Sequence, residues 1–328
     1  MSRKTYATAI RDVISEEMSR DERVFIMGED IETLGGVFGC TRDLYQRFGT
    51  ERVRNTPISE AGFIGAGLGA ACAGMRPICE LMYMDFTLVA MDQLLNQVAK
   101  TRYIFGGNAR IPLVIRGQQG IGRGNAATHS QSLETIFMHI PGLKVACPST
   151  AADAAGLLRT AIRDDNPVIF FEHKALYAEK GEVPDDTDYM VPFGKADIKK
   201  PGKDVTILAN LLYVSRALEA ARQLEAEGID AEVIDPRTLV PFDYETVVSS
   251  VKKTGRLVVV HEAHRSAGWG AEAASEITER AFQYLDAPPV RLGAAACPLP
   301  FNLGLETAAT PQVADIKKAV KQVLYVDH

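Results

Sequence analysis

The sequence places one acid at the head of a segment that has almost no side chains. Glu60 opens the stretch EAGFIGAGLGAACAG (60–74), in which most of the other residues are glycine or alanine. Glycines inside a helix cost about 0.5–1 kcal/mol each relative to alanine, so they persist where close packing offsets the loss. Residues four apart share one face of a helix. Two adjacent rows of small residues result: Ala61, Gly65, Gly69 and Ala73, and Gly62, Ala66, Ala70 and Gly74.

We expect this smooth face to lie against another helix or backbone, for instance across a subunit interface. Glu60 itself then has two interpretations. An acid at a helix N-terminus is favoured by the helix dipole, a contribution of about 0.3–1 kcal/mol. Alternatively, the helix delivers a carboxylate to a rigid, dry place where it handles a proton. The residue types alone leave both open.

The same stretch also matches a dinucleotide fingerprint, GxGxxA, at Gly65, Gly67 and Ala70. That fingerprint belongs on the turn after a strand, with an acid about twenty residues further on. The preceding residues, RNTPISE (54–60), do not have the pattern of a strand. We therefore predict that this is not a nucleotide site, although a nucleotide-binding oxidoreductase remains an alternative that thermal shift with NAD would test.

A second candidate is the glycine-rich stretch GQQGIGRGNAATHSQS (117–132), which contains His129. Glycine-rich loops let the backbone approach a ligand. The stretch is either a ligand loop that ends in a histidine at a helix start or a flexible surface loop. Phe86, in YMDFTLVAMDQ (83–93), is likewise either a core residue or a ring that contacts a ligand.

Asp164 and Asn166 follow a predicted helix in AIRDDNP (161–167). Carbonyls at a helix end together with Asp and Asn side chains offer hard oxygen ligands for a cation. A helix-ending turn before Pro167 explains the same residues. His261 and His264, in HEAH, lie three apart at a predicted strand end, and we interpret them as a loop and not as a zinc site.

Composition limits the class of protein. The 328 residues are 46% hydrophobic and 24% charged, which is typical of a globular protein of about two domains. The net charge is −6, with no lysine or arginine run, which disfavours nucleic acid and anionic membrane surfaces as partners. No apolar run is long enough to span a membrane. Five scattered cysteines predict reduced thiols and a cytoplasmic location, and the N-terminal residues predict an amphipathic helix and not a targeting peptide.

Short apolar runs alternate with segments of helical spacing, which predicts βαβ units on mostly parallel sheets. The expected strands are VFIMG (24–28), PICELM (77–82), IPLVIRG (111–117), LKVAC (143–147), PVIFF (167–171), VTILAN (205–210), AEVIDP (231–236) and RLVVVHEA (256–263). A proline-rich, charged stretch without periodicity predicts a linker at 186–204. Two α/β domains follow, 1–185 and 205–328.

Several stretches occur together in one order: GEDIETLGGVFGCT (28–41), NTPISEAGFIGAG (55–67), MYMDF (82–86), THSQS (128–132), PGLKVACPS (141–149) and AIRDDNPVIF (161–170). This ordered set, over essentially the whole chain, resembles the beta subunit of the thiamine-diphosphate-dependent component of 2-oxo acid dehydrogenase complexes. The family includes pyruvate, branched-chain 2-oxo acid and acetoin dehydrogenases. LLNQVAKTRYIFGGNA (94–109) and NPVIFFEHKALY (166–177) look closest to the acetoin branch.

The resemblance implies a pyrimidine-binding α/β domain followed by a transketolase C-terminal-type domain. It implies that Glu60 hydrogen-bonds the N1′ nitrogen of the thiamine aminopyrimidine and so helps the cofactor to lose its C2 proton. It also implies that Phe86 lies against the aminopyrimidine ring, that Glu29 lies near the cofactor, and that His129 faces the thiazolium and the incoming lipoyl group. A monovalent-cation site, expected to hold potassium, is implied at Leu113, Ala161, Ile162, Asp164 and Asn166.

The resemblance further implies partners. The diphosphate and Mg²⁺ are expected on a separate alpha chain, since the family's GDG motif does not occur in this sequence. We expect an α2β2 heterotetramer in a bacterial cytoplasm that decarboxylates a 2-oxo acid, or cleaves acetoin, and passes the acyl group to a lipoyl acyltransferase core. The alternatives are a branched-chain 2-oxo acid dehydrogenase subunit and a non-catalytic scaffold subunit of the same fold.

Overall fold

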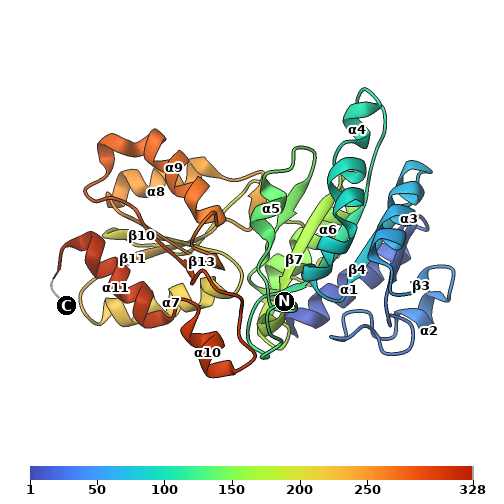
Figure 1. The fold of residues 1–328 in the computed structure, drawn as a ribbon, viewed down its shortest axis with the longest axis horizontal. Coiled ribbons are helices and arrows are strands. Elements are labelled where there is room, and N and C mark those ends of the chain that lie inside the picture. The colour runs from blue at the N-terminus through green and yellow to red at the C-terminus, as the bar shows by residue number, and fades with distance from the viewer. Residues whose placement is uncertain (327–328) are drawn as a thin grey trace. The chain divides into compact units, whose positions relative to one another are not determined.

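The computed structural model describes residues 1–326, which form two compact units of helices and strands (Figure 1). The first unit comprises Met1–Gln119 and Ile136–Phe193, and the second comprises Gly120–Thr135 and the chain from Gly194 onward. The predicted boundaries, 1–185 and 205–328, do not anticipate that Gly120–Thr135 packs with the second unit. The last two residues of the predicted second domain lie outside the described residues.

The first unit is built on parallel strands in the order β6-β7-β5-β4-β2-β3. Strands covered on both faces have continuous apolar runs, and β2 and β7 are buried at every position. The predicted runs therefore coincide with strands. Their bounds are β2 Val24–Gly28, β3 Val53–Asn55, β4 Arg76–Leu81, β5 Val114–Gln119, β6 Lys144–Ala146 and β7 Val168–His173.

The first helix of the first unit begins at a capped position and buries one face. Helix α1 (Tyr6–Arg20) is the predicted N-terminal amphipathic helix. Thr5 caps it by accepting a bond from Thr8 N at 3.1 Å. Helices α1 and α6 pack on each other, and α3 packs on β4. The other elements here are α2 Leu44–Phe48, α3 Glu60–Cys72, η1 Met84–Ala90, η2 Gln93–Val98, α4 Thr101–Ile104, α6 Ala151–Arg163, η3 Lys174–Leu176 and an antiparallel pair, β1 Ser2–Thr5 and β8 Lys180–Val183.

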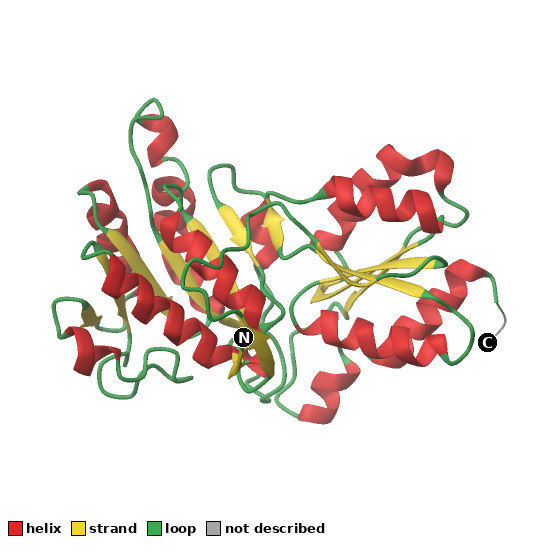
Figure 2. Cartoon of the chain, turned by 180° about the vertical axis from the view of Figure 1, so that it is seen from behind, coloured by secondary structure: helices red, strands yellow, loops and turns green. Residues whose placement is uncertain are grey.

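The second unit is a layered α/β domain with strand order β14-β13-β10-β11-β9. Helices α8 and α9 cover one face of this sheet, and α7 and α11 cover the other (Figures 1 and 2). Strand β9 lies inside the predicted linker and joins the sheet antiparallel to β11. The bounds are β9 Asp197–Lys200, β10 Val205–Ala209, α7 Leu212–Glu225, β11 Ala231–Asp235, β12 Thr238–Val240, α8 Tyr244–Thr254, β13 Leu257–His264, α9 Trp269–Ala281, η4 Phe282–Tyr284, β14 Val290–Ala294, α10 Leu303–Ala308 and α11 Val313–Leu324; α5 runs from Glu134 to Met138.

The α/β prediction is confirmed, with local corrections. The segment RNTPISE was predicted to contain no strand, but Arg54 and Asn55 belong to β3. The fingerprint residues Gly65 and Gly67 nevertheless lie inside α3, several residues beyond the turn that a dinucleotide site requires. Among residues 1–326, no helix combines the length and apolar composition needed to cross a bilayer.

Candidate active site

Three predicted site residues follow neighbouring strands of the first unit. Glu29 comes directly after β2, Glu60 begins α3 soon after β3, and Phe86 lies in η1 after β4. These strands are adjacent and parallel, in the order β4-β2-β3. The carboxyl ends of parallel strands meet at one edge of a sheet, which is where α/β proteins bind ligands. The topology therefore gathers the three residues at one edge.

Glu60 is the first residue of α3, as predicted, and it is only 6% exposed. Helix α3 packs against β4, η1 and η2, so the segment that carries Phe86 lies beside the helix that carries Glu60. The Ser59 side chain makes no capping bond. A buried carboxylate at the positive end of a helix is electrostatically favoured there, and it is also in position to exchange a proton with a ligand.

The glycines of α3 divide into packed and open positions. A Cβ on Gly67 would come 2.7 Å from Cys79 Sγ and 3.2 Å from Leu113, so only glycine allows this contact. The two predicted rows of small residues behave differently, because Gly62, Ala66 and Gly69 are exposed. An added Cβ on Gly69 would meet nothing within 4 Å. Close packing of this smooth face inside the chain is thus not observed among the described residues.

Glu29 is a buried carboxyl whose Oε1 lacks a hydrogen-bond partner among the described residues and whose charged neighbours are acids. It is 6% exposed, and its Oε1 has no hydrogen-bond partner within residues 1–326. Burial, then the neighbouring Glu60 and Asp30 carboxylates, raise the pKa of Glu29 to about 7 from an ordinary 4.5. Because Glu60 contributes to this shift, the two carboxyl groups interact. A buried carboxyl that titrates near neutrality is suited to general acid–base chemistry.

Phe86 lies half-buried in an aromatic group and not in the apolar core. Its ring meets Tyr83 edge-to-face with a centroid distance of 5.9 Å, and Tyr83 meets Phe38 at 6.0 Å. Phe38 stacks on Tyr177 at 5.3 Å. Edge-to-face and offset pairs of this kind contribute about 0.5–1.5 kcal/mol each. They hold Phe86 at the ligand edge of the sheet with part of the ring accessible.

His129 lies in the second unit, on the glycine-rich loop that follows β5. Its Nδ1 lies 2.9 Å from Thr128 Oγ1, and its backbone N–H donates to Ala126 O at 3.3 Å. One of the two interpretations of this stretch placed the histidine at a helix start, but helix α5 begins five residues later, at Glu134. The ring is half-exposed on a structured loop. Its proposed role near the other site residues stays a prediction.

Four residues of the predicted cation site lie at or just beyond the end of α6, where Asp164 is the C-cap: Ala161, Ile162, Asp164 and Asn166. The fifth, Leu113, directly precedes β5, and its carbonyl accepts from Val168 N at 2.9 Å. Oxygens of Ile162, Asp164 and Asn166 already accept bonds from charged groups. Arg76 donates to Ile162 O at 2.9 Å and to Asp164 O at 2.7 Å, and Arg102 donates to Asn166 Oδ1 at 2.7 Å. Lys144 pairs with the Asp164 carboxylate. A potassium ion would have to compete with these three side-chain cations for the oxygens. Potassium binding at this site stays a prediction.

A buried ionic layer beside the site was missed by the sequence reading. Arg116 on β5 donates to both oxygens of Glu172 on β7 at 2.6 Å and also pairs with Glu80 on β4. Tyr177 Oη donates to Glu172 Oε2 at 2.7 Å. Burial raises the pKa of Glu80, and Arg116 opposes that rise. Glu80 and Arg116 interrupt predicted apolar strand runs, and Glu172 directly follows one; these positions were the available signal.

The ionic layer supports the loop that leads away from Glu29. A Cβ on Gly36 would come 2.5 Å from Glu80 Oε1, and one on Gly28 would come 2.6 Å from Glu80 O. Gly36 also has a φ of +71°. Only glycine fits at a positive φ beside these atoms. The backbone on both sides of Glu29 therefore packs directly against Glu80.

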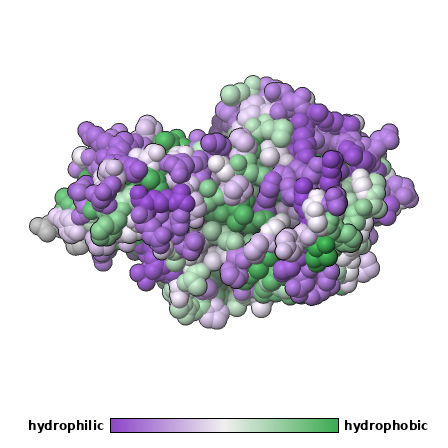
Figure 3. All heavy atoms as spheres, turned by 90° about the horizontal axis from the view of Figure 1, so that it is seen from above, coloured by the Kyte–Doolittle hydropathy of each residue, from purple (hydrophilic) through white to green (hydrophobic). Residues whose placement is uncertain are grey.

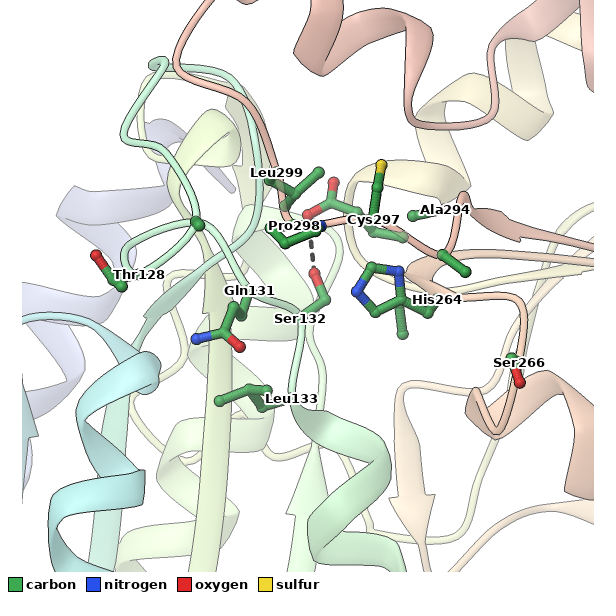
Figure 4. Close-up of a pocket in the computed structure, with 14 residues that line it drawn as sticks. Thr128, Gln131, Ser132, Leu133, His264, Ser266, Ala294, Cys297, Pro298 and Leu299 are labelled. Carbon is green, nitrogen blue, oxygen red and sulfur yellow. Dashed lines mark hydrogen bonds between the residues drawn. The ribbon is translucent and has the colours of Figure 1, made fainter.

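The loop of His129 also forms one wall of a pocket of about 590 Å³ in the second unit (Figure 4). Thr128, Gln131 and Ser132 come from the loop, and His264 and Cys297 come from the end of β13 and the segment after β14. His264 Nδ1 lies 2.7 Å from Ala295 O. His261, by contrast, is fully buried, and burial lowers its pKa to about 4. Both histidines lie within β13, so the interpretation of HEAH as a loop is wrong.

Comparison with known proteins matches the chain to two domain families of transketolase. The family described as "Transketolase, pyrimidine binding domain" matches residues 2–180, and "Transketolase, C-terminal domain" matches residues 194–316. A relative from Rhizobium meliloti named "Pyruvate dehydrogenase E1 component subunit beta" is 47% identical over 99% of this chain and 71% of its own length. One from Cupriavidus necator, named "Acetoin:2,6-dichlorophenolindophenol oxidoreductase subunit beta", is also 47% identical, over 99% of this chain and 98% of its own.

Among solved structures, one titled "Split gene transketolase, inactive beta4 tetramer" aligns with a TM-score of 0.79. It covers 98% of this chain and 99% of its own, at 23% identity. This similarity confirms the fold, a pyrimidine-binding α/β domain followed by a transketolase C-terminal-type domain.

Proposed function

The chain belongs to the transketolase-type family that contains the E1 beta subunits, and we propose that it is the beta subunit of a thiamine-dependent 2-oxo acid or acetoin dehydrogenase. With an alpha partner it decarboxylates a 2-oxo acid, or cleaves acetoin, and transfers the acyl group to a lipoyl domain. The observation that carries the proposal is the interacting pair of buried carboxyls, Glu29 and Glu60, at the carboxyl edge of the first sheet.

The residues at this edge fit an aminopyrimidine. Glu29 Oε1 and Thr56 Oγ1 are buried polar atoms without a hydrogen-bond partner within residues 1–326, so donors and acceptors remain for a nitrogen-rich ring. Phe86 offers an aromatic face beside them. Thiamine diphosphate, when bound, supplies the stabilised carbanion that these reactions require.

The chain's own residues hold and move protons around that group. We propose that Glu60 hydrogen-bonds the N1′ nitrogen of the aminopyrimidine and exchanges a proton there. Glu29, with a pKa near 7, is partly protonated at neutral pH and moderates the negative charge beside Glu60. Phe86 packs on the ring, and His129 serves the acyl-transfer side of the reaction.

The alpha partner is proposed to bring the diphosphate site and its Mg²⁺. The sequence has no GDG motif, and an acidic chain with net charge −6 offers little to a multiply charged anion. Exposed apolar side chains support the proposal of a partner chain. Tyr103, Ile104 and Phe105 at α4 are all exposed, and the exposed fraction of Tyr103 is 88%. Figure 3 shows hydrophobic areas among hydrophilic ones on the face it presents. Exposed apolar groups of this kind are typical of interaction sites. The open face of α3 is a second candidate contact in an α2β2 assembly.

The choice of substrate stays open among pyruvate, acetoin and branched-chain 2-oxo acids. The relatives named for pyruvate and for acetoin are equally identical to this chain, at 47%, so the predicted acetoin preference is a proposal. A scaffold role is disfavoured because Glu60, Phe86 and His129 are all present. We also propose that this subunit binds a potassium ion at Asp164 and Asn166. Its further partner is proposed to be a lipoyl acyltransferase core.

Isothermal titration tests the two-chain proposal. Thiamine diphosphate with Mg²⁺ is titrated into this chain alone and into the chain co-purified with its alpha partner. We expect micromolar or tighter binding only with the partner, together with turnover of one of the three substrate classes. Micromolar binding and turnover by this chain alone would contradict the shared site.

A further inference from the structure

Two carboxylates of the second unit hold the backbone of the loop that carries His129. Ile121 N donates to Glu262 Oε1 at 2.9 Å, and Gly122 N donates to Glu306 Oε2 at 3.0 Å. Glu262 lies in the buried part of β13, and Glu306 lies on α10. The two acids are far from the loop in the sequence, 141 and 184 residues away. The entry of the loop is therefore fixed by tertiary contacts.

The same Glu262 also holds the exit of the loop. Ser132 Oγ donates to Glu262 Oε1 at 2.8 Å, the bond drawn dashed in Figure 4. Thr135 Oγ1 then accepts from Trp269 N at 3.0 Å. Residues 123–131, which include His129, thus lie between anchored ends. A closed loop with fixed ends has much less conformational freedom than a free one.

Burial makes these bonds strong. Glu262 is 5% exposed and Glu306 is 2% exposed. A buried carboxylate is costly unless it accepts hydrogen bonds, and bonds from backbone N–H groups to a charged acceptor are stronger than neutral ones. Glu306 Oε1 has no hydrogen-bond partner within residues 1–326, so Gly122 N is the contact that compensates this carboxylate.

Close contact between the loop backbone and the rest of the second unit also explains the glycines of the loop. Gly124 has a φ of +61°, and a Cβ there would come 2.6 Å from Phe301 O. Gly122 also has a positive φ, of 111°. A side chain at Gly124 would push the loop away from the segment that leads to α10. The glycine-rich composition therefore serves close contact with the second unit and not flexibility.

We propose that Glu262 and Glu306 are positioning residues that hold His129 in its working place. The proposal rests on the proposed function of His129 in acyl transfer. Neither carboxylate touches the reacting atoms; each acts through the loop backbone. Supporting groups of this kind set the geometry of residues that touch a substrate.

Hydrogen exchange of the full chain tests the anchoring without any assay of activity. In Glu306→Ala, the amides of residues 120–135 should exchange about tenfold faster or more, the effect of losing one bond to a charged acceptor. Glu306→Gln retains a carbonyl oxygen that accepts from Gly122 N, so it should exchange within about threefold of the natural chain. Unchanged exchange in Glu306→Ala would overturn the proposal.

A matched control separates anchoring from general destabilisation. Asp243 is also buried in the second unit and accepts from Thr246 N at 3.2 Å and Ala196 N at 3.0 Å. Asp243→Ala removes comparable bonds away from the loop, so it should leave exchange at 120–135 unchanged. Equal acceleration there in Asp243→Ala and Glu306→Ala would mean that Glu306 only stabilises the fold.

Activity of the assembled complex gives the second readout. Glu306→Ala should slow acyl transfer to lipoamide about tenfold and slow reduction of an artificial electron acceptor much less, while Glu306→Gln restores transfer. His129→Ala, measured beside it, should show the same selective loss. A selective loss in His129→Ala without one in Glu306→Ala overturns the positioning role. No selective loss in His129→Ala instead refutes the proposed function of the histidine, whatever the exchange data show.

Discussion

The first unit buries two groups of carboxyls that differ in what surrounds them. Glu80 and Glu172 enclose Arg116, and Tyr177 adds a further donor, so this layer finds its counter-charge inside the chain. Glu29 instead has Glu60 and Asp30 as its electrostatic neighbours, and both raise its pKa. A folded chain retains a carboxyl without a counter-charge, such as Glu29, where something else supplies the compensation. The comparison separates a structural charge cluster from one that awaits a ligand.

The largest effect is expected from breaking the compensated group. Arg116→Met leaves Glu80 and Glu172 buried without a cation, which should destabilise the first unit by about 3–5 kcal/mol. Urea unfolding or limited proteolysis of the chain measures the loss. Arg222→Met, on an exposed pair with Glu219, is the control and should change stability by less than about 0.5 kcal/mol.

If Arg116→Met gives no folded chain, the double variant Arg116→Met with Glu172→Gln keeps the comparison testable. Removing the Glu172 charge should recover part of the lost stability, because one uncompensated carboxylate then remains in place of two. A single variant as stable as the natural chain would show that this layer is not compensated by Arg116.

The pair of Glu29 and Glu60 should be important for catalysis and dispensable for folding. Glu60→Gln preserves size but removes proton exchange, so turnover of the complex should fall about 10²–10⁴-fold. Assembly and melting temperature should stay close to those of the natural complex. Glu51→Gln, at an exposed acid, is the matched control. Near-normal turnover in a correctly assembled Glu60→Gln complex would remove Glu60 from the mechanism.

The raised pKa of Glu29 should make the free energy of unfolding depend on pH. The folded pKa of about 7 lies above the ordinary 4.5, so between these values the folded chain retains a proton that the unfolded chain has released. The free energy of unfolding should therefore fall as pH rises through this window and level off above pH 7. Thermal melts from pH 5 to 8 measure the slope. Glu29→Gln should flatten it, and Glu60→Gln should lower the pKa of Glu29.

An unaltered slope in Glu29→Gln would mean that another group titrates in this window. It would then place Glu29 in a more polar environment than its burial indicates, and the distinction between the two carboxyl groups would weaken.

A further acid, Asp164, gives the smallest expected effect. It is bonded by Lys144 and Asn166, which lower its pKa against the effect of burial. If potassium binds there, it should raise the melting temperature by about 2–4 °C relative to choline at equal ionic strength, the shift that 1 kcal/mol produces. Asn166→Ala should abolish the difference. Equal melting in both salts would leave Asp164 as a compensated helix end.

Local patterning explains what could be predicted from the sequence. Apolar runs such as VFIMG became buried parallel strands, because a strand covered on both faces needs a continuous run. Glu60 was identified as a helix start for a similarly local reason: small residues follow it at helical spacing. The ordered motifs identified the family, since the matching stretches extend over both units.

Long-range pairing decided the rest. The charges of Glu80, Arg116 and Glu172 are scattered in the sequence, and only the parallel register of β4, β5 and β7 brings them together. The second unit, not the first, holds the loop of His129, because Glu262 and Glu306 bind its backbone from distant positions. The sequence by itself determines periodicity and residue chemistry, which are local. Which buried charge finds a partner depends on strand order and register, and these are properties of the folded chain.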